Sequence, residues 1–357
     1  MKAMILAAGV GSRLDPITRT TPKPMVPVVG LPVIEHIVRL LEKHGFDDII
    51  CNTHYLAEQI EDYFAHKTDL QAKVSFNREE KLLGTAGGLK RVQDERNFFS
   101  SDEPFLVVGG DDLTSVDLGA MLAQHREKGA LATIALTEVE DPSQFGVVVL
   151  GDNNEIQRFV EKPKPGTAPS NLVNMGVYLF DPKILDKIPS GEFYDFGKQV
   201  FPQIQEAGEP FFGFKSREYW RDVGNLREYR DVQGDFFTGE VELYTGLTNR
   251  GDGVWLGDNV QIAPDAKLEA PCAIGANSQI GTDAQISKGS VLGKGVLIGS
   301  GAVVEQSILW DGAQIGDGAH LVRCIVGHDC SVQSNAGVFD AVIVPPKVVQ
   351  VAQTLEK

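Results

Sequence analysis

Short apolar runs alternate with amphipathic stretches through the first 235 residues. The runs are strand-like, with predicted strands at 4–8, 48–52, 105–110 and 131–136. The stretches between them carry apolar residues at helical spacing, with predicted helices at 32–44, 57–64 and 118–128. Pro32 suits the first turn of its helix, and Gly45 follows the last turn. Buried strands that alternate with helices predict an α/β domain whose mainly parallel sheet is covered on both faces.

From Leu256 onward an aliphatic residue recurs at every sixth position. The series is Leu256, Ile262, Leu268, Ile274, Ile280, Ile286, Leu292, Ile298 and Val304. It continues through Leu309, Ile315, Leu321 and Val326 with two five-residue steps. Six is a poor period for an α-helix, but it suits short strands joined by tight turns, with coils stacked about 4.8 Å apart. The pattern predicts a left-handed parallel β-helix built from hexapeptide repeats.

The change of period divides the chain into parts. We predict an α/β domain at 1–235, a linker at 236–253, the β-helix at 254–345 and a C-terminal tail at 346–357. The linker is placed where glycines gather, at Gly239, Gly246, Gly251 and Gly253.

The negative net charge of the chain limits the kinds of molecule that we expect it to bind. Lys and Arg number 33 against 49 Asp and Glu, giving a net charge of −16. Such a chain repels nucleic acid and anionic lipid, so neither is expected as a partner. The first residues show no targeting or membrane segment, and four scattered cysteines read as reduced core residues. We therefore expect a cytoplasmic protein.

A strand runs directly into Gly9-Val10-Gly11-Ser12-Arg13. Glycines let the backbone turn and bring N–H groups close to a phosphate, and Arg13 adds a charged fork of donors. The segment is neither a dinucleotide fingerprint nor a P-loop, because the third glycine and the Gly-Lys-Ser/Thr are missing. Alone, it would read as an ordinary turn between a strand and a loop.

Lys23 strengthens the reading as a phosphate site. It lies between Pro22 and Pro24, which hold the backbone extended, a short loop away from Arg13. A lysine fixed in this way can place a second cation on the same polyphosphate. The alternative is a surface lysine in a proline-rich loop.

These segments resemble the signature of the sugar-1-phosphate nucleotidyltransferases, the NDP-sugar pyrophosphorylases. Further resemblances follow in the family's order along the whole chain: Leu83-Gly84-Thr85-Ala86-Gly87, Val108-Gly109-Gly110-Asp111, Phe145-Gly146-Val147-Val148, Glu161-Lys162-Pro163, Asn174-Met175-Gly176 and Trp220-Arg221-Asp222-Val223-Gly224. The length and the C-terminal repeats are most similar to the mannose-1-phosphate guanylyltransferase branch. The resemblance implies a Rossmann-like nucleotidyltransferase domain followed by the β-helix.

The resemblance also implies roles for single residues. Arg13 and Lys23 would be catalytic, and Asp111 and Asp222 would hold Mg²⁺. The nucleotide would lie against Leu6, Ala7, Ala8, Gly9, Gly11, Glu80, Gly84 and Thr85. The sugar phosphate would lie against Gly146, Glu161, Lys162 and Asn174.

Several of these assignments have a plain alternative. Asp112 stands beside Asp111 and leaves the register of the metal ligand open, and Asp222 could be a turn residue. Glu161-Lys162-Pro163 could be a solvated strand end. The residues from Gly84 could form a loop that enters a helix, presenting free N–H groups to an anion or a base.

The implied reaction joins a nucleoside triphosphate to a hexose 1-phosphate and releases pyrophosphate. The resemblance favours GTP and mannose 1-phosphate, and a carboxylate such as Glu80 could accept hydrogen bonds from guanine. UTP or dTTP with glucose 1-phosphate is the alternative, as is a catalytically silent subunit that senses an NDP-sugar.

The repeats have a flat side and an end strand that must be covered, which favours a homo-oligomer formed through the β-helix. A second activity, acyl transfer with His328 as base, is the lesser alternative to a structural role for that residue.

Overall fold

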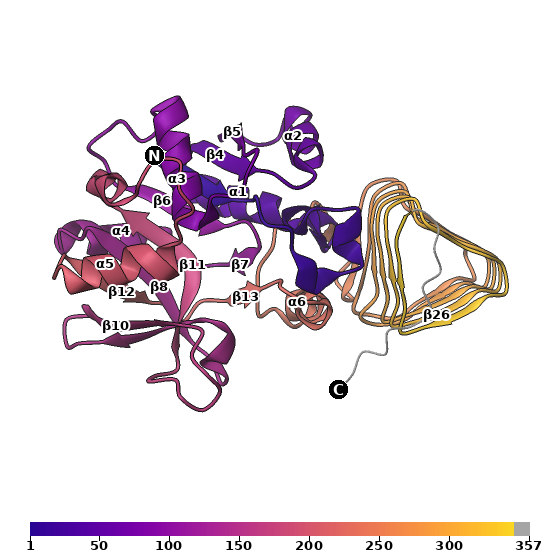
Figure 1. The fold of residues 1–357 in the computed structure, drawn as a ribbon. Helices are drawn as coiled ribbons and strands as arrows, with labels where there is room; N and C mark the ends of the chain where they lie inside the picture. Colours follow the sequence, from indigo (N-terminus) through magenta and orange to yellow (C-terminus); the bar gives the residue numbers. More distant parts are fainter. Residues whose placement is uncertain (346–357) are drawn as a thin grey trace. The chain divides into compact units, whose positions relative to one another are not determined.

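The computed structural model describes residues 1–345, which form two compact units (Figure 1). The first unit comprises Met1–Val10, Pro22–Pro24 and Ile34–Asp222. The second comprises Gly11–Thr21, Met25–Val33 and the described residues from Val223 onward. The predicted tail, 346–357, lies outside the described residues. No helix within the described range is both long and apolar enough to cross a membrane.

The first unit is built on a nine-stranded sheet. Its strands are β1 (Lys2–Leu6), β4 (Asp48–Thr53), β5 (Lys73–Arg78), β6 (Phe105–Gly109), β8 (Ala132–Glu138), β9 (Gly146–Leu150), β10 (Ile156–Glu161), β11 (Leu172–Phe180) and β12 (Phe211–Lys215). The order is β10-β9-β11-β6-β1-β4-β5, with β8 joined to β11 and β12 joined to β8. Strands β6, β1, β4 and β5 run parallel, as the sequence predicts, whereas β11 runs antiparallel to β6, β8 and β9.

The predicted helices of this unit are present within one or two residues. They are α1 (Val33–Lys43), α2 (Ala57–Ala65) and α4 (Leu118–Glu127), and two more are α3 (Gly84–Arg96) and α5 (Phe201–Glu206). Gly45 ends α1 with a φ of 77°, and the N–H of Phe46 donates to the carbonyl of Leu41 at 2.9 Å. The first strand ends at Leu6 rather than at residue 8, because the N–H of Ala7 donates to the side chain of Asn52.

Aromatic rings fill much of the core of this unit. Phe105, Tyr178, Phe180, Phe196 and Phe201 are all less than a tenth exposed, and they form a continuous series of ring contacts. Burying an aromatic side chain stabilises the fold by about 1.5–3 kcal/mol.

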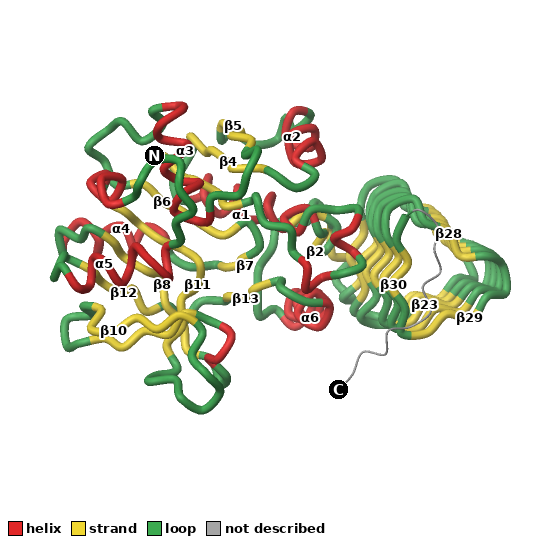
Figure 2. Tube along the Cα trace, viewed as in Figure 1, coloured by secondary structure: helices red, strands yellow, loops and turns green. Residues whose placement is uncertain are grey.

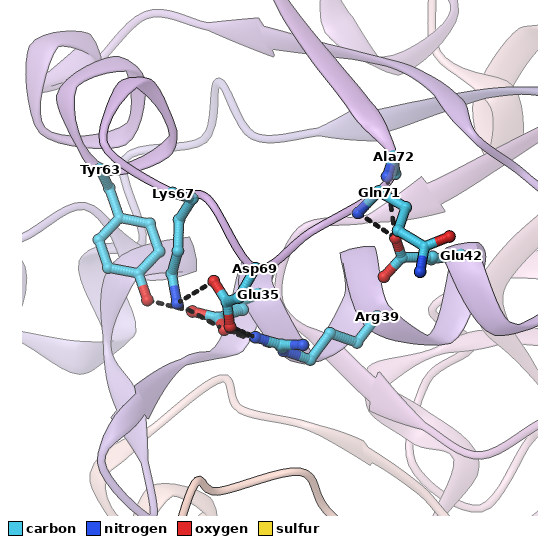
Figure 3. Close-up of polar contacts among 8 residues, drawn as sticks. All are labelled: Glu35, Arg39, Glu42, Tyr63, Lys67, Asp69, Gln71 and Ala72. Carbon is cyan, nitrogen blue, oxygen red and sulfur yellow. Dashed lines mark hydrogen bonds and ion pairs between the residues drawn. The ribbon is translucent and has the colours of Figure 1, made fainter.

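A buried carboxylate ties α1 to α2 and to the loop that follows it (Figure 3). The Glu35 side chain is 0% exposed and accepts hydrogen bonds from Lys67 at 2.8 Å, from Arg39 at 2.7 Å and from the hydroxyl of Tyr63. Arg39 also donates to Asp69. Burial favours a raised pKa for Glu35, but these three donors outweigh it and lower the pKa from its ordinary value.

The second unit contains the parallel β-helix, in which three ladders of short strands form three flat faces (Figure 2). The first sheet holds β14 (Thr248–Asn249), β15 (Val254–Leu256), β18 (Cys272–Ile274), β21 (Val291–Leu292), β24 (Ile308–Leu309), β27 (Ile325–Val326) and β30 (Val342–Ile343). The second sheet holds β16 (Gln261–Ile262), β19 (Gln279–Ile280), β22 (Leu297–Ile298), β25 (Gln314–Ile315) and β28 (Ser331–Val332). The third sheet holds β17 (Lys267–Leu268), β20 (Gln285–Ile286), β23 (Val303–Glu305), β26 (His320–Val322) and β29 (Gly337–Phe339).

The aliphatic residues of the hexapeptide series point inward and form the core of these coils. The two five-residue steps fall at the same corner of successive coils, after β23 and after β26, where Gln306 and Arg323 adopt positive φ. Because the shortened corners stack, the three ladders stay in register.

Helix α6 (Leu226–Thr238) packs on the first sheet of the β-helix. The Phe236 ring lies 4.9 Å from that of Trp255, and the indole N–H of Trp310 donates to the Tyr229 hydroxyl at 2.8 Å. The outward positions of this sheet include Ala273, Val291, Ile308 and Ile325, all apolar and buried.

Regular structure enters the predicted linker, 236–253, from both sides. Its first three residues continue α6, whose apolar face packs on the β-helix, and Thr248–Asn249 pairs with β15. The domain boundaries given above, at 1–235, 236–253 and 254–345, therefore remain a prediction.

The remaining strands form two small pairs. One is β2 (Pro27–Val28) with β3 (Leu31–Pro32), and Pro32 therefore precedes α1 rather than opening it. The other is β7 (Asp112–Thr114) with β13 (Trp220–Asp222).

Candidate active site

The first unit has a cavity of 390 Å³ where its parallel strands end. Strands β1, β4 and β6 each contribute a lining residue at or next to the carboxyl end, and β5 is followed by another. The lining comprises Leu6, Ala8, Gly9, Asn52, Glu79, Leu82, Gly84, Thr85, Gly109, Asp111, Asp112, Gly176, Tyr178, Phe193 and Asp195. The carboxyl edge of a parallel sheet is the usual place for a ligand in an α/β fold.

Three predicted residues meet beside this cavity. Lys23 opens a short 3-10 helix, Asp111 follows β6, and Asp222 ends β13. The Lys23 Nζ lies 2.9 Å from an Asp222 oxygen and also contacts Asp111. Residues 88 and 199 positions away along the chain thus converge on one ammonium group.

The Lys23 ammonium is held in its charged form. Its burial acts to lower the pKa, but the charges of Asp111 and Asp222 outweigh burial and raise the pKa above the ordinary value. Lys23 is only 7% exposed, so the cation is fixed in place rather than solvated.

The two carboxylates fit a divalent cation. Their oxygens already converge on a single positive group, and carboxylate oxygen is the ligand that Mg²⁺ prefers. No group of three or more His, Cys, Asp or Glu side chains arranged to hold a metal occurs within residues 1–345. An ion bound here would therefore complete its coordination with phosphate oxygens and water.

The structure separates Asp111 from its neighbour. Asp111 pairs with Lys23, whereas Asp112 lies opposite Asp222 in the β7–β13 pair and against Gly109 and Gly176. Burial holds the pKa of Asp112 well above its ordinary value, and the charges of Asp111 and Asp222 add to the effect.

A chain of hydrogen bonds lines the side of the cavity predicted for the base. The Ala7 N–H donates to Asn52 at 2.9 Å, and the Asn52 amide donates to Glu79 at 2.6 Å. The second Glu79 oxygen accepts from the N–H of Leu83 at 3.2 Å. The Ala7 N–H is therefore engaged within the protein, and Ala7 does not line the cavity.

The predicted carboxylate, Glu80, is exposed and absent from the lining, whereas Glu79 is buried and lines the cavity. The two glutamates are adjacent in one loop, so the predicted residue and the residue that lines the cavity differ by one position. Glu79 packs against the backbone of α3, where a side chain at Gly88 would collide with it.

The first turn of α3 is joined to the segment before α5. Gly84 and Thr85 line the cavity as predicted residues, but the N–H groups of Ala86 and Gly87 donate to the carbonyl of Tyr194. These two amides are therefore not available to an anion. The Thr85 hydroxyl donates to Asp195 at 3.0 Å, which fixes the same junction through side chains.

The residues predicted for the sugar phosphate lie on β9, β10 and β11 or, for Lys162, directly after β10, outside the cavity lining. Glu161 ends β10 opposite Gly146, and its burial, aided by the charge of Asp195, raises its pKa. The Asn174 amide donates to the hydroxyl of Tyr178 at 2.8 Å, so Asn174 borders the cavity through that ring. Lys162 is exposed, with a φ of 44°.

Gly11 and Arg13 belong to the second unit. Gly11 has a φ of 69° and precedes the 3-10 helix that contains Arg13. Among the other predicted residues, Leu6, Ala8 and Gly9 line the cavity.

Sequence reasoning missed several lining residues: Asn52, Glu79, Leu82, Tyr178, Phe193 and Asp195. Asn52 carried a usable signal, because it is a polar residue at the end of a buried strand. Phe193 carried none, since a single aromatic residue in a loop does not indicate where it lies.

Comparison with known proteins identifies the class. Residues 2–238 match the family described as nucleotidyl transferase, and residues 251–355 match the left-handed β-helix (LbH) domain of EIF2B subunit epsilon. The fold is that of a nucleotidyltransferase enzyme. The chain belongs to the sugar-1-phosphate nucleotidyltransferase family and carries a C-terminal LbH domain.

Its relatives differ in the base they use. The UTP–glucose-1-phosphate uridylyltransferase of Synechocystis sp. is 41% identical over 273 residues, 73% of this chain and 70% of that enzyme. A protein of Arabidopsis thaliana named as a mannose-1-phosphate guanylyltransferase is 36% identical over 64% of this chain and 63% of its own length. The crystal structure of HddC from Yersinia pseudotuberculosis complexed with GMP-PN has a TM-score of 0.57 and 26% identity, covering 66% of this chain and 99% of that one.

Proposed function

We propose that this enzyme transfers the uridylyl group of UTP to glucose 1-phosphate, giving UDP-glucose and pyrophosphate. The observation that supports the reaction is the convergence of Lys23, Asp111 and Asp222 at the carboxyl edge of the sheet. Two phosphorylated reactants repel each other, and a fixed cation together with a divalent ion held by the two carboxylates would offset that repulsion.

The protein needs no nucleophile of its own. A phosphate oxygen of glucose 1-phosphate attacks the α-phosphorus in line, the bond to the bridging oxygen breaks, and pyrophosphate leaves with its electron pair. Mg²⁺ held by Asp111 and Asp222 would supply neutralising charge on the phosphate oxygens. The role of the protein is to align the reactants and to exclude unproductive positions.

The basic and polar residues predicted for the site have the following roles in this proposal. Lys23 neutralises the polyphosphate and the departing pyrophosphate, and Lys162 holds the phosphate of the sugar. The catalytic role proposed for Arg13 rests on the resemblance of its sequence motif. Glu161 and Asn174 bind sugar hydroxyls.

The hydrogen bonds that Glu79 already accepts, and its burial, favour a pyrimidine base. Guanine presents several N–H donors on one edge and calls for an acceptor such as a carboxylate. Glu79 already accepts from Asn52 and Leu83 and is only 3% exposed. Uracil presents a single N–H donor between two carbonyls, which backbone groups can read.

GTP with mannose 1-phosphate, the pair favoured by the sequence, is the second candidate. The guanylyltransferase of Arabidopsis and the complex of HddC with GMP-PN support it. The dTTP and glucose 1-phosphate pair belongs with the uridylyl proposal, because thymine and uracil present the same edge.

A panel of triphosphates against glucose 1-phosphate and mannose 1-phosphate, read by pyrophosphate release, tests the choice. We expect kcat/KM to be highest for UTP with glucose 1-phosphate, by at least about tenfold over GTP with mannose 1-phosphate, a difference of about 1.4 kcal/mol. A higher value for GTP with mannose 1-phosphate would overturn the base assignment and leave the reaction class intact.

The alternative function from a different class is a catalytically silent subunit that senses an NDP-sugar. It predicts no pyrophosphate release with any pair, together with binding of the NDP-sugar.

The proposal also includes self-association through the β-helix. His328 has a structural explanation, since its ring packs 4.9 Å from that of Trp310.

A further inference from the structure

A short loop at 192–195 lies between the two sides of the candidate site. Its backbone is hydrogen-bonded to the first turn of α3, where Gly84 and Thr85 are predicted to bind the nucleotide. It then leads into a π-helical turn, Phe196–Val200, which lies against Glu161, a residue predicted to bind the sugar. The loop is therefore in contact with an element of each predicted subsite.

Backbone contacts hold the loop against α3. The N–H of Tyr194 donates to the carbonyl of Leu83 at 2.8 Å, and the carbonyl of Tyr194 accepts from the first turn of the helix, as described above. The two segments pack without space for a side chain between them, because a Cβ atom at Gly84 would lie 2.6 Å from the Tyr194 carbonyl oxygen. The position of this turn of α3 therefore depends on the position of the loop.

The carboxylate of Asp195 joins the loop to both neighbours. One oxygen accepts from the Thr85 hydroxyl at 3.0 Å, and the other accepts from the N–H groups of Gly197 at 3.1 Å and Lys198 at 3.2 Å. The Thr85 oxygen in turn accepts from the N–H of Phe196 at 2.9 Å. Both Asp195 oxygens are thus engaged within the protein, although the residue lines the cavity. This arrangement suits a side chain that holds its neighbours in place.

The turn that Asp195 caps borders the predicted sugar side. A Cβ atom at Gly197 would lie 2.7 Å from an oxygen of Glu161, so the backbone of the turn lies directly against that carboxyl group. Phe196, the first residue of the turn, is buried and contacts the rings of Tyr178 and Phe201. The turn is anchored in the core, and Asp195 connects it to α3.

We propose that Asp195 is a positioning residue for nucleotidyl transfer, which holds the nucleotide side at Thr85 and the sugar side at Glu161 in one fixed arrangement. The inference rests on the proposed function, because that function assigns the two sides to the two substrates. Without Asp195 both sides can move, and each substrate has to fix its own side when it binds. The lost conformational entropy then weakens the binding of both substrates.

Steady-state kinetics with the best pair from the substrate panel test the proposal. Asp195→Ala should raise KM about tenfold for both the triphosphate and the sugar phosphate, and should lower kcat by less than about threefold. The variant keeps the Thr85 hydroxyl and the Glu161 carboxyl, so the losses come from their position. Asp181→Ala is the matched control, because Asp181 also caps a short helix, accepting from Lys183 at 2.9 Å, and does not line the cavity. Both KM values should stay unchanged in the control.

Further variants separate the two connections that Asp195 makes. Thr85→Val keeps the shape of the side chain without its hydroxyl and should raise KM for the triphosphate alone, whereas Thr85→Ser should restore it. Gly197→Ala places a methyl group against Glu161 and should raise KM for the sugar phosphate alone. In the double variant Thr85→Val with Asp195→Ala, KM for the triphosphate should equal that of Asp195→Ala, because the same hydrogen bond is lost in both.

A rise in KM for only one substrate in Asp195→Ala overturns the proposal, as do equal rises in the Asp181→Ala control. Additive losses in the double variant would show that Thr85 acts through a contact of its own. Circular dichroism checks the fold, and if Asp195→Ala does not fold, unchanged KM values in Thr85→Val and Gly197→Ala overturn the proposal instead. A wild type without turnover on any pair contradicts the proposed function, which the substrate panel tests separately.

Discussion

At the scale of single residues, the site depends on the placement of one buried cation. Removing Lys23 leaves Asp111 and Asp222 facing each other without their shared partner. We expect Lys23→Ala to lower kcat by about 10²–10³, the usual effect of losing a positioned charge. Asp111→Asn should lose a similar factor and keeps the size of the side chain.

Initial rates of pyrophosphate release at saturating substrate measure these losses. Lys43→Ala is the control, because Lys43 ends α1 and does not line the cavity. A turnover near that of the wild type in either site variant would remove that residue from the mechanism.

Phe193 gives a second prediction at this scale. It is 56% exposed, lines the cavity and lies against Gly84, on the side predicted for the base. If the base stacks on this ring, Phe193→Ala should raise KM for the triphosphate about tenfold to a hundredfold, equivalent to about 1–3 kcal/mol. KM for the sugar phosphate and kcat should change little, and Phe193→Tyr should restore binding.

Phe339→Ala is the matched control, since Phe339 is equally exposed, on the third sheet of the β-helix, and does not line the cavity. Equal KM values for the triphosphate in wild type and Phe193→Ala would exclude stacking.

The sequence allowed the charged centre of the candidate site and part of the cavity lining to be predicted, but not the rest of the lining. Lys23 is marked by two flanking prolines, and Asp111 by the end of a buried strand. The choice of Glu79 over Glu80 depends on packing against Gly88, a contact distant in sequence that no local pattern encodes. The same holds for Phe193 and Tyr178.

At the scale of elements, apolar runs and helical spacing predicted β1, β4, β6 and β8 and the helices α1, α2 and α4 of the first unit, but not its later strands such as β11. Helix α3 was expected only as an alternative, a helix entered by a loop at Gly84, because its glycines have low helical propensity; the structure begins the helix at Gly84 itself, and tertiary hydrogen bonds to Tyr194 hold its first turn. The covered face of the β-helix did leave a signal. The residue before each inward aliphatic is apolar at Ala273, Val291 and Ile308, once per coil.

The Glu35 cluster gives the prediction for this scale. Its folded pKa is lowered from the ordinary value of 4.5, so its contribution to stability is fully present above that pH and is lost as the pH falls through the folded pKa. Glu35→Gln should lower the free energy of unfolding by about 3 kcal/mol at neutral pH, because three donors lose a buried charged acceptor. The loss should shrink below pH 4.5.

Urea unfolding at a series of pH values measures both effects. Glu103→Gln, which breaks the exposed pair with Arg126, should cost less than about 1 kcal/mol. An equal cost in the two variants would show that burial of the cluster contributes nothing.

At the scale of the whole molecule, the acidic chain holds a buried cation at the edge of the sheet. Lys23 is paired there with Asp111 and Asp222, while the chain as a whole has a net charge of −16. The negative charge opposes non-specific association with other anionic molecules, so phosphate binding depends on cations that the protein fixes in place.

Along the three ladders, each strand of the β-helix pairs with the strand of the coil before it and the strand of the coil after it. A gene duplication of one coil can therefore lengthen the solenoid while the pairing within the other coils is kept. The domain can change in length in steps of one coil, and its cross-section stays the same.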